Sequence, residues 1–392
     1  MKRYRIKELG DIVTGNTPSK KNLDYYNSED IPFFKPDSLD ENEVAYLTTA
    51  KEYLSSNAKS VARIVPRETV LFSCIGSIGK IGITNVDNSS FNQQINAIIP
   101  NKEIILPKYL CYALKYNKKK IQAIANAAVV PIINKTQFSE FEISIHQKEE
   151  QVKVVKILDQ AQELIDKRKA QIEALDELIQ SVFYDMFGDP GLNSKGWETG
   201  RISDIIVKTQ YGTSTKANET EGEYAVLRMN NITYSGNWDF KSLKYVDLDE
   251  KDREKYLVYK GEVLFNRTNS KELVGKTAVY KREKPMAYAG YLVKATPNNR
   301  ANGQFIASYM NTKYTKSLLF NMAKNIVGMA NINAEEFKNI KVYIPPIEIQ
   351  DQFAEIVENI EKQKELLNER LVELENNFNS LMQRAFNGGS LR

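Results

Sequence analysis

The sequence is poor in the residues that metal centres and nucleophilic catalysis require. Its 392 residues include one histidine, His146, and two cysteines, Cys74 and Cys111. A single histidine excludes histidine-rich metal sites, and any Ser-His or Cys-His triad would depend on that one residue. The two cysteines have no paired spacing, so the sequence predicts neither a disulfide framework nor a zinc site. Low cysteine content favours a reducing, cytoplasmic location.

Long apolar runs and cofactor motifs are also missing. No apolar run approaches the roughly 20 residues that cross a bilayer, and the first residues lack a signal-peptide core. Gly275-Lys276-Thr277 resembles the end of a phosphate loop, but Ser270 stands where that motif needs its first glycine. The Asn-Pro-Pro-Tyr and Asp-Pro-Pro-Tyr tetrads of methyltransferases are absent. We therefore predict no catalytic residue, no metal site and no cofactor bound by this chain.

One long segment is present twice. Residues 145–188 and 344–389 align without a gap at an offset of 199, which pairs Gln151 with Gln350. In both copies apolar residues keep a heptad spacing for about four heptads, which is typical of a coiled coil. Each helix would be roughly 55 to 60 Å long. The predicted seam consists of Leu158, Ile165, Ile172, Leu175, Ile179, Val357, Ile360, Leu367, Leu371, Leu374 and Phe378.

Two basic residues interrupt this seam, Arg168 at a d position and Lys364 at an a position. One interpretation is that their stems pack in the seam while their charged ends extend to water. The other is that they fix the register or the orientation of the two helices. The heptad pattern alone leaves both interpretations open.

The remaining sequence is duplicated as well, at offsets that grow from 193 through 196 to 199. The chain therefore divides into residues 1–144, helix 145–189, residues 190–343 and helix 344–392. Short β-branched and aromatic runs with loops between them, each set followed by an amphipathic helix near 107–126 or 302–325, predict two α+β domains. An antiparallel helix pair would give the whole chain pseudo-two-fold symmetry. The strand runs are 31–34, 70–73, 80–84, 97–99, 224–228, 262–265, 276–280 and 291–295. His146 matches Pro345 and is interpreted as a structural junction.

Polar loops lie at matching places in the two domains. The net charge of +4 is too small to require a nucleic-acid partner, so the distribution of side chains carries more information. Amide and guanidinium groups read base edges, while hydroxyls, lysines and backbone amides hold phosphates. Different residues at the same places predict two readers of different DNA sequences. The candidate DNA-binding residues are Asn16, Thr17, Ser19, Lys20, Lys35, Ser77, Lys80, Asn92, Gln93, Gln94, Asn134, Gln210, Tyr211, Thr213, Ser214, Arg228, Asn230, Asn231, Asn266, Arg267, Lys276 and Asn333.

These features together resemble the specificity subunit of type I restriction-modification enzymes, over essentially the whole chain. The first domain and the second helix carry the specific marks. In two places the sequence departs from the pattern, at Ile145-His-Gln-Lys148 and at Tyr211-Gly-Thr-Ser214. The matching stretches are Gly15-Asn-Thr-Pro-Ser19, Ile31-Pro-Phe-Phe34, Val70-Leu-Phe-Ser73, Gly76-Ser-Ile-Gly-Lys80, Asn92-Gln-Gln94 and Ile344-Pro-Pro-Ile-Glu-Ile-Gln350.

The resemblance implies a non-catalytic subunit with two target recognition domains, each of which reads one half of a bipartite double-stranded DNA target. The helices would set the spacer and dock two methyltransferase subunits that carry S-adenosylmethionine. Restriction subunits that use ATP and Mg would join the complex for cleavage. Exposed helix positions expected to face partners are Lys153, Lys156, Lys167, Glu173, Asp176, Glu355, Glu361, Glu369 and Glu373. Two alternatives remain, a coiled-coil scaffold without a DNA role and a stand-alone DNA-modifying enzyme.

Overall fold

The structure is a computed structural model that describes residues 1–41, 43–125, 130–326 and 329–387. The chain forms two compact units, residues 1–169 with the C-terminal stretch from residue 369, and residues 170–368. Each unit thus contains one α+β domain, half of the first long helix and half of the second. This composition confirms the predicted fold class of tandem domains with a coiled coil.

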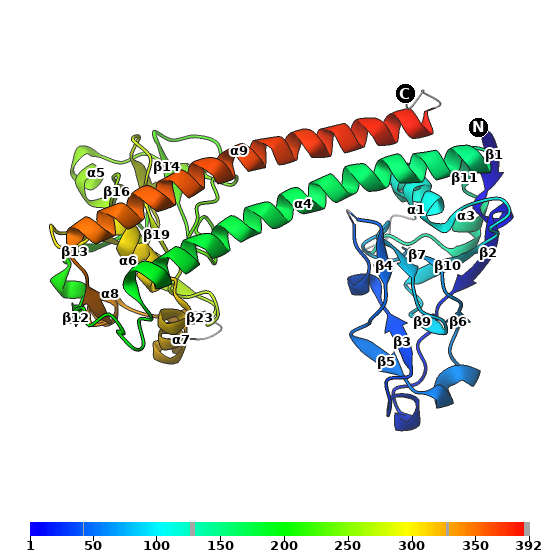
Figure 1. The fold of residues 1–392 in the computed structure, drawn as a ribbon, viewed down its shortest axis with the longest axis horizontal. Coiled ribbons are helices and arrows are strands. Elements are labelled where there is room, and N and C mark those ends of the chain that lie inside the picture. The colour runs from blue at the N-terminus through cyan, green and yellow to red at the C-terminus, as the bar shows by residue number, and fades with distance from the viewer. Residues whose placement is uncertain (42, 126–129, 327–328, 388–392) are drawn as a thin grey trace. The chain divides into compact units, whose positions relative to one another are not determined.

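The domain of the first unit has two main sheets, with strand orders β2-β10-β7-β8-β4 and β5-β3-β9-β6, and a small β1-β11 ribbon. Helices α1 and α3 cover one face of the larger sheet (Figure 1). The elements are β1 (Lys2–Arg5), β2 (Gly10–Thr14), β3 (Ile31–Phe34), β4 (Ala45–Leu47), β5 (Glu52–Leu54), β6 (Ile64–Val65), β7 (Val70–Ser73), β8 (Ile81–Thr84), β9 (Ser89–Phe91), β10 (Ile95–Pro100), α1 (Pro107–Tyr116), α2 (Lys118–Ala123), α3 (Lys135–Glu140) and β11 (Glu142–Ile145).

The domain of the second unit repeats this plan with the orders β13-β21-β17-β19 and β15-β14-β20-β16, the ribbon β12-β24, and a further β18-β23-β22 sheet. Its elements are β12 (Glu198–Arg201), β13 (Ile206–Tyr211), β14 (Tyr224–Leu227), β15 (Lys244–Val246), α5 (Glu250–Tyr256), β16 (Leu257–Val258), β17 (Val263–Asn266), β18 (Thr268–Asn269), β19 (Thr277–Val279), β20 (Met286–Tyr288), β21 (Leu292–Pro297), α6 (Gly303–Met310), α7 (Lys313–Met322), β22 (Lys324–Ile326), β23 (Met329–Asn331), α8 (Ala334–Lys338) and β24 (Lys341–Ile344).

Both faces of the larger sheet are buried, which explains why three of the four residues of its central strand β7 are apolar. All four residues of β7 are buried. Successive side chains of a strand point to opposite faces, and here Val70 and Phe72 join the core beneath the helices while Leu71 joins the core against the second sheet. The second domain repeats the division, since Val263 and Phe265 face one core and Leu264 the other. The continuous apolar runs in the sequence therefore mark central strands.

The two long helices are α4 (Lys148–Phe187) and α9 (Ile347–Phe386). They pair in an antiparallel sense within each unit. Leu158 of α4 shares a core with Phe378 of α9 in the first unit, and in the second the rings of Phe183 and Phe353 lie 5.6 Å apart. All predicted seam residues are buried or half-buried.

Both helices begin three residues later than the sequence predicts. Ile145 ends β11 and Ile344 ends β24, because each of these strands pairs with the first strand of its own domain. The first helix ends before Gly188, whose φ is +82°. Gly389, the predicted end of the second helix, lies outside the described residues.

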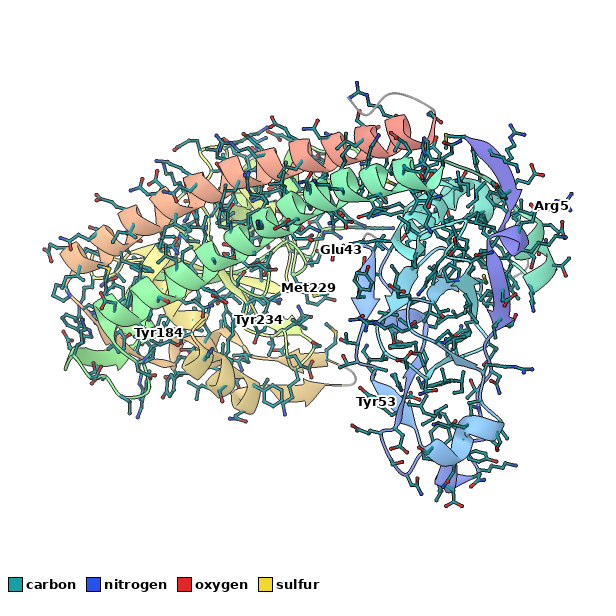
Figure 2. All side chains as sticks on the ribbon, turned by 45° about the vertical axis from the view of Figure 1, so that its right-hand side comes forward. Arg5, Glu43, Tyr53, Tyr184, Met229 and Tyr234 are labelled. Atoms are coloured by element: carbon teal, nitrogen blue, oxygen red, sulfur yellow. The ribbon has the colours of Figure 1, made fainter. Side chains whose placement is uncertain are left out.

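Lys364 in the seam forms an ion pair with Asp176 of α4, and its side chain is 14% exposed. This contact favours the interpretation that Lys364 fixes the helix pairing. It also corrects the assignment of Asp176 to a partner-facing surface. Glu361, placed on the same surface, is half-buried and pairs with Lys281. Arg168 is half-buried. Near the middle of α4, the Lys169 Nζ lies 3.3 Å from a carboxylate oxygen of Glu43, which is labelled beside the helix in Figure 2.

A buried glutamine fastens each long helix to its own domain. The Gln151 side chain accepts the Leu106 N–H at 2.9 Å and donates to the carbonyls of Ile104 and His146 at 2.9 and 3.0 Å. Gln350 makes the equivalent bonds, with the N–H of Asn302 and the carbonyls of Arg300 and Pro345. Both glutamines are 0% exposed. We call these two bond sets the glutamine clamps.

His146 has the structural role that the sequence indicates. Its Nδ1 lies 2.9 Å from the Tyr109 hydroxyl, and its carbonyl accepts a bond from the first glutamine clamp. Burial lowers the pKa of His146, so the imidazole stays neutral near pH 7. Its position and hydrogen bonds place it at the junction between the first domain and α4.

The helices predicted at 107–126 and 302–325 are each broken in two. The break falls at Asn117 in the first domain, where the Asn117 Nδ2 donates to the Ala113 carbonyl at 2.8 Å. In the second it falls at Asn311 and Thr312, and the Asn311 Nδ2 donates to the Ala307 carbonyl at 2.8 Å. Asparagine side chains that bond backbone carbonyls compete with helix continuation. Asn126, the predicted end of the first of these helices, lies outside the described residues.

Candidate nucleic-acid interface

The polar loops of the first domain meet at one edge, because the strands that carry them end there. The Gly15 N–H donates to the Ile95 carbonyl and the Asn16 N–H to the Phe91 carbonyl, both at 3.1 Å. The Asn92 N–H donates to the Phe34 carbonyl at 3.1 Å, and the Cys74 N–H to that of Gln94 at 2.8 Å. The Ile133 N–H in turn donates to the Cys74 carbonyl at 2.9 Å. These bonds join the five polar loops that contain Asn16, Lys35, Ser77, Asn92 and Asn134 into one surface, which we call the first recognition edge.

The second domain has the same backbone connections at its own edge. The Gly212 N–H donates to the Leu292 carbonyl at 3.2 Å, and the Thr213 N–H to the Tyr288 carbonyl at 2.9 Å. The Ala289 N–H donates to the Leu227 carbonyl at 2.9 Å. Finally, the Ile332 N–H donates to the Arg267 carbonyl at 2.9 Å. These bonds define the second recognition edge.

The two edges therefore share a backbone scaffold but carry different side chains. A glycine occupies the crossing point of both. A Cβ at Gly15 would lie 2.2 Å from the Asn92 oxygen, and one at Gly212 would lie 2.3 Å from the Ala289 oxygen. Only glycine allows the loops to approach this closely.

At the first edge, several predicted residues hold the loops together. The Asn16 side chain donates to the Val61 carbonyl and accepts the Arg63 N–H, at 2.7 and 2.8 Å. The Thr17 hydroxyl donates to Gln93 at 2.8 Å. The Asn92 side chain is buried and bonds Gln94, donating to its side-chain oxygen and accepting its N–H.

The predicted lysines of the first edge differ in their ion pairing and exposure. Lys20 and Lys35 both pair with Glu52, and Lys20 does so at 3.9 Å while remaining largely exposed. Lys80 is half-buried, and its N–H donates to the Ser73 hydroxyl at 2.9 Å. The predicted residues of this edge that are exposed are Thr17, Ser19, Lys20, Ser77, Gln93 and Asn134.

Two predicted asparagines have a capping role in the structure. Asn134 is the N-cap of α3, and its side chain accepts the Gln137 N–H at 2.8 Å. Asn333 is the N-cap of α8, and its side chain accepts the Glu336 N–H at 2.9 Å. In both helices the third residue bonds back to the cap, which forms a capping box. The spacing of Asn134 to Gln137 and of Asn333 to Glu336 was the sequence signal for this role.

At the second edge, three predicted residues shape the loop after β14. The ammonium group of Lys276, which is 7% exposed, donates to the carbonyls of Met229 and Ile232. The buried Asn231 side chain accepts the Arg228 N–H at 2.9 Å and donates to the Asp239 carbonyl at 2.8 Å. The Arg228 guanidinium donates to the Ser242 carbonyl at 2.6 Å.

Two other predicted residues of this edge, Arg267 and Gln210, contact Tyr211. The Arg267 guanidinium carbon lies 5.0 Å from the centre of the Tyr211 ring, and the Tyr211 hydroxyl accepts the Ala334 N–H at 3.0 Å. Gln210 donates to the Tyr211 carbonyl at 3.2 Å. Asn266 is fully buried beside Arg267, and Thr213 is 4% exposed. Ser214 and Asn230 are exposed.

A second lysine, not among the predicted residues, also supports the loop after β14. Lys316 of α7 donates to the Tyr234 carbonyl, and its Nζ lies 3.4 Å from the centre of the Tyr234 ring. Met229 and Tyr234, which both lie on this loop, are labelled in Figure 2. Burial, with a smaller contribution from the charge of Lys276, lowers the pKa of Lys316 to about 8. The loop is thus held by two ammonium groups that have lost much of their hydration.

We expect the stability of this unit to depend on Lys316 and pH. The ordinary lysine pKa is 10.5, so between about pH 8 and 10.5 the unfolded chain binds more protons than the folded chain. The free energy of unfolding therefore rises with pH through this window. Urea unfolding at pH 7, 8 and 9.5 should show the wild-type chain gaining stability relative to Lys316→Met. A constant difference between the two proteins would contradict this assignment, and the exposed Lys313→Met serves as control.

The cysteine thiols are buried and unsuited to nucleophilic chemistry. Cys74 and Cys111 are free, and burial raises the pKa of Cys74 to about 12 and that of Cys111 further. No group of three or more His, Cys, Asp or Glu side chains within the described residues could hold a metal ion. In the same part of the chain, no helix is both long and apolar enough to cross a membrane.

Comparison with known proteins identifies the family. Residues 1–174 and 194–376 match the family described as the type I restriction modification DNA specificity domain. The chain is 28% identical over 242 residues to the MjaIX specificity subunit of Methanocaldococcus jannaschii, covering 57% of this chain and 55% of that protein. It is 31% identical over 180 residues to the HindI specificity subunit of Haemophilus influenzae, covering 43% and 38%. The chain thus spans about half or less of the length of these relatives.

Solved structures share the fold over nearly the full chain. The S subunit of the type I restriction-modification system from M. genitalium aligns with a TM-score of 0.55, covering 98% of this chain and 96% of that one. A chain from a study of complex assembly and conformational transition of the type I R-M system aligns with a TM-score of 0.61, covering 98% and 97%. Both are 16% identical in sequence, so this likeness concerns the fold. The family match covers most of the sequence, and the chain belongs to the type I restriction modification DNA specificity family.

Proposed function

We propose that this chain is the DNA-reading subunit of a type I restriction-modification enzyme and that each recognition edge binds one half of a bipartite target. The observation that carries the proposal is the shared backbone scaffold of the two edges with different side chains on each. A common scaffold presents both sets of side chains to duplex DNA in the same way. Different side chains then select different bases.

The chain acts without catalysis in this proposal, and its partners supply the chemistry. Two methyltransferase subunits with S-adenosylmethionine dock on exposed faces of α4 and α9 and methylate adenine, and restriction subunits that use ATP and Mg join them in the cytoplasm. Suitable exposed docking positions include Lys153, Lys156 and Lys167 on α4. Glu355, Glu369 and Glu373 offer acidic positions on α9.

Base-resolution mapping of methyladenine tests the proposal directly. The chain and its methyltransferase are expressed together in cells without other DNA methylation. The expected result is one consensus of two short sequences with a fixed unread spacer. Methylation without a split consensus would overturn the two-reader proposal. If the assembled methyltransferase shows no salt-sensitive DNA binding in a gel shift, a scaffold role is favoured, and turnover by the purified chain alone would indicate an enzyme.

Exchange of one domain tests the modular part. Replacing residues 190–343 by the corresponding domain of another family member should change one half of the methylated consensus. The other half should stay as it is, because each domain folds around its own cores and closes its own clamp. Methylation mapping of the hybrid checks the result, with exchange of residues 1–144 as the reciprocal control. A change in both halves after either exchange would contradict independent reading.

A further inference from the structure

The second recognition edge contains donors without acceptors. Arg228 Nε, Asn266 Nδ2 and Arg267 Nε are all buried and have no hydrogen-bond partner among the residues that the structure describes. Arg228 follows β14, Asn266 is the last residue of β17, and Arg267 comes next. Buried donors without partners are uncommon in folded proteins, because burial removes their hydration and nothing replaces it. Their position indicates that this edge is built to meet an acceptor.

Arg267 is the donor group best placed to meet such an acceptor. Its two terminal nitrogens make only long bonds, at 3.5 Å to the Gly290 carbonyl and 3.3 Å to the Asn331 side chain. Typical N–H···O bonds span 2.7–3.2 Å. No carboxylate among the described residues forms an ion pair with Arg267. The guanidinium thus keeps most of its donor capacity and its full charge.

Tyr211 supports this guanidinium through its aromatic ring. The ring lies 5.0 Å from the guanidinium carbon, which is within range of a cation–π contact. Its hydroxyl accepts the Ala334 N–H, so the ring is itself anchored, and 41% of Tyr211 is exposed at the edge. A group held on an anchored ring loses little entropy when it binds a ligand.

The first edge has no equivalent of this pair. The Ile133 N–H bonds the Cys74 carbonyl as the Ile332 N–H bonds that of Arg267, so Cys74 occupies the matching place. Cys74 is 2% exposed, and its thiol accepts a bond from Asn96 Nδ2 at 3.2 Å. The neighbouring Ser73 has its hydroxyl bonded to both Ser77 and Lys80. The Arg267–Tyr211 pair is therefore a feature of the second edge, and the matching place in the first edge carries a buried cysteine.

We propose that Arg267, held on Tyr211, reads a guanine in the half-site bound by the second domain. This inference rests on the proposed function. Guanine presents two acceptors, N7 and O6, in the major groove, and a planar guanidinium matches both at once. A phosphate would accept the same donors, and the experiment separates the two ligands.

The experiment uses the assembled methyltransferase and duplexes derived from its methylated consensus. Each base pair of the second half-site is replaced in turn, and binding is measured for the wild type and for Arg267→Gln. The wild type should lose about 5- to 150-fold in affinity when one particular G·C pair is replaced. Arg267→Gln should bind the consensus more weakly by a similar factor and lose the preference at that pair alone.

Two substitutions of Tyr211 test the role of its ring. Tyr211→Phe keeps the ring but loses the bond from the Ala334 N–H, so it should weaken the preference less than Tyr211→Ala, which removes the ring. Arg253→Gln is the matched control, because Arg253 lies 5.7 Å from the Tyr224 ring at the opposite end of β14 and pairs with Glu223. It should leave every preference unchanged. Thermal unfolding of each variant verifies that it is folded.

Other outcomes would overturn the guanine assignment. An equal loss for all duplexes, with a salt slope smaller by about one, would identify a phosphate contact. A second half-site without any G·C pair, or unchanged preferences in Arg267→Gln, would also reject it. Failure of the proposed function is distinguishable, since the wild-type complex would then show no split consensus.

Discussion

Replacing Gln151 by leucine is expected to lower the free energy of unfolding of the first unit by at least about 3 kcal/mol. The substitution leaves three backbone groups, the Leu106 N–H and the carbonyls of Ile104 and His146, without their partner. Each buried unsatisfied group costs about 1–3 kcal/mol. Gln350→Leu should cost the second unit a similar amount, because its clamp has the same bonds.

Urea unfolding of the variants and the wild type measures this effect. Gln160→Leu is the matched control, since Gln160 is an exposed glutamine on α4, and surface changes usually stay within about 0.5 kcal/mol. A Gln151→Leu variant as stable as the control would show that water replaces the side chain at no cost. Folded variants should also bind target DNA more weakly, because the clamp fixes the domain on its helix.

Gly212→Ala should also have a large effect, a loss of affinity for target DNA, because it disturbs the second recognition edge. The added Cβ would lie 2.3 and 2.4 Å from the backbone oxygens of Ala289 and Tyr288. Backbone atoms cannot rotate away, so the loops must separate and the bonds of Gly212 and Thr213 to β21 and β20 must lengthen. Overpacking of this kind costs about 1–3 kcal/mol. We expect at least a tenfold loss of affinity for the target.

Gly290→Ala is the control for this change. It lies on the same edge, but a Cβ there would be 3.5 Å from the nearest atom, an ordinary contact. Binding of the assembled methyltransferase to duplexes altered in one half-site measures both variants. Gly212→Ala should lose preference only in the half-site of the second domain, and Gly15→Ala only in the other. Equal behaviour of Gly212→Ala and Gly290→Ala would contradict the close approach as its cause.

The sequence was sufficient to predict the large-scale fold because its strongest signals are long or repeated. A heptad spacing kept for about four heptads identifies α4 and α9. The predicted four-residue strand runs 31–34 and 70–73 match the observed strands β3 and β7 residue for residue. The predicted starts of the two long helices were wrong, because they depend on which strand pairs with the residues before each helix. Ile145 looks like the first turn of a helix until its partner Lys2 is known.

The candidate sites were harder to predict, because the same polar side chain can either bond its own loop or contact a ligand. Lys276 was assigned to DNA by its type, yet its ammonium group lies against backbone carbonyls of its own domain. Lys35 is paired with Glu52, a residue 17 positions away that no local pattern connects to it. The glutamine clamps were visible only as two matched glutamines in the repeat. Their role depends on the backbone groups that surround them, and these become known only from the fold.

The backbone hydrogen bonds of the two recognition edges have a consequence for how the sequence of such a protein can evolve. Hydrogen bonds between backbone amides and carbonyls, such as those of Gly15, Ile95, Gly212 and Leu292, set the positions of the loops. Substitution of an exposed side chain on these loops leaves the bonds in place. A lineage can therefore replace Ser19 or Asn230, both exposed, at little cost in stability. New target preferences can arise by substitution of a few exposed side chains, while the hydrogen-bonded backbone that positions them stays the same.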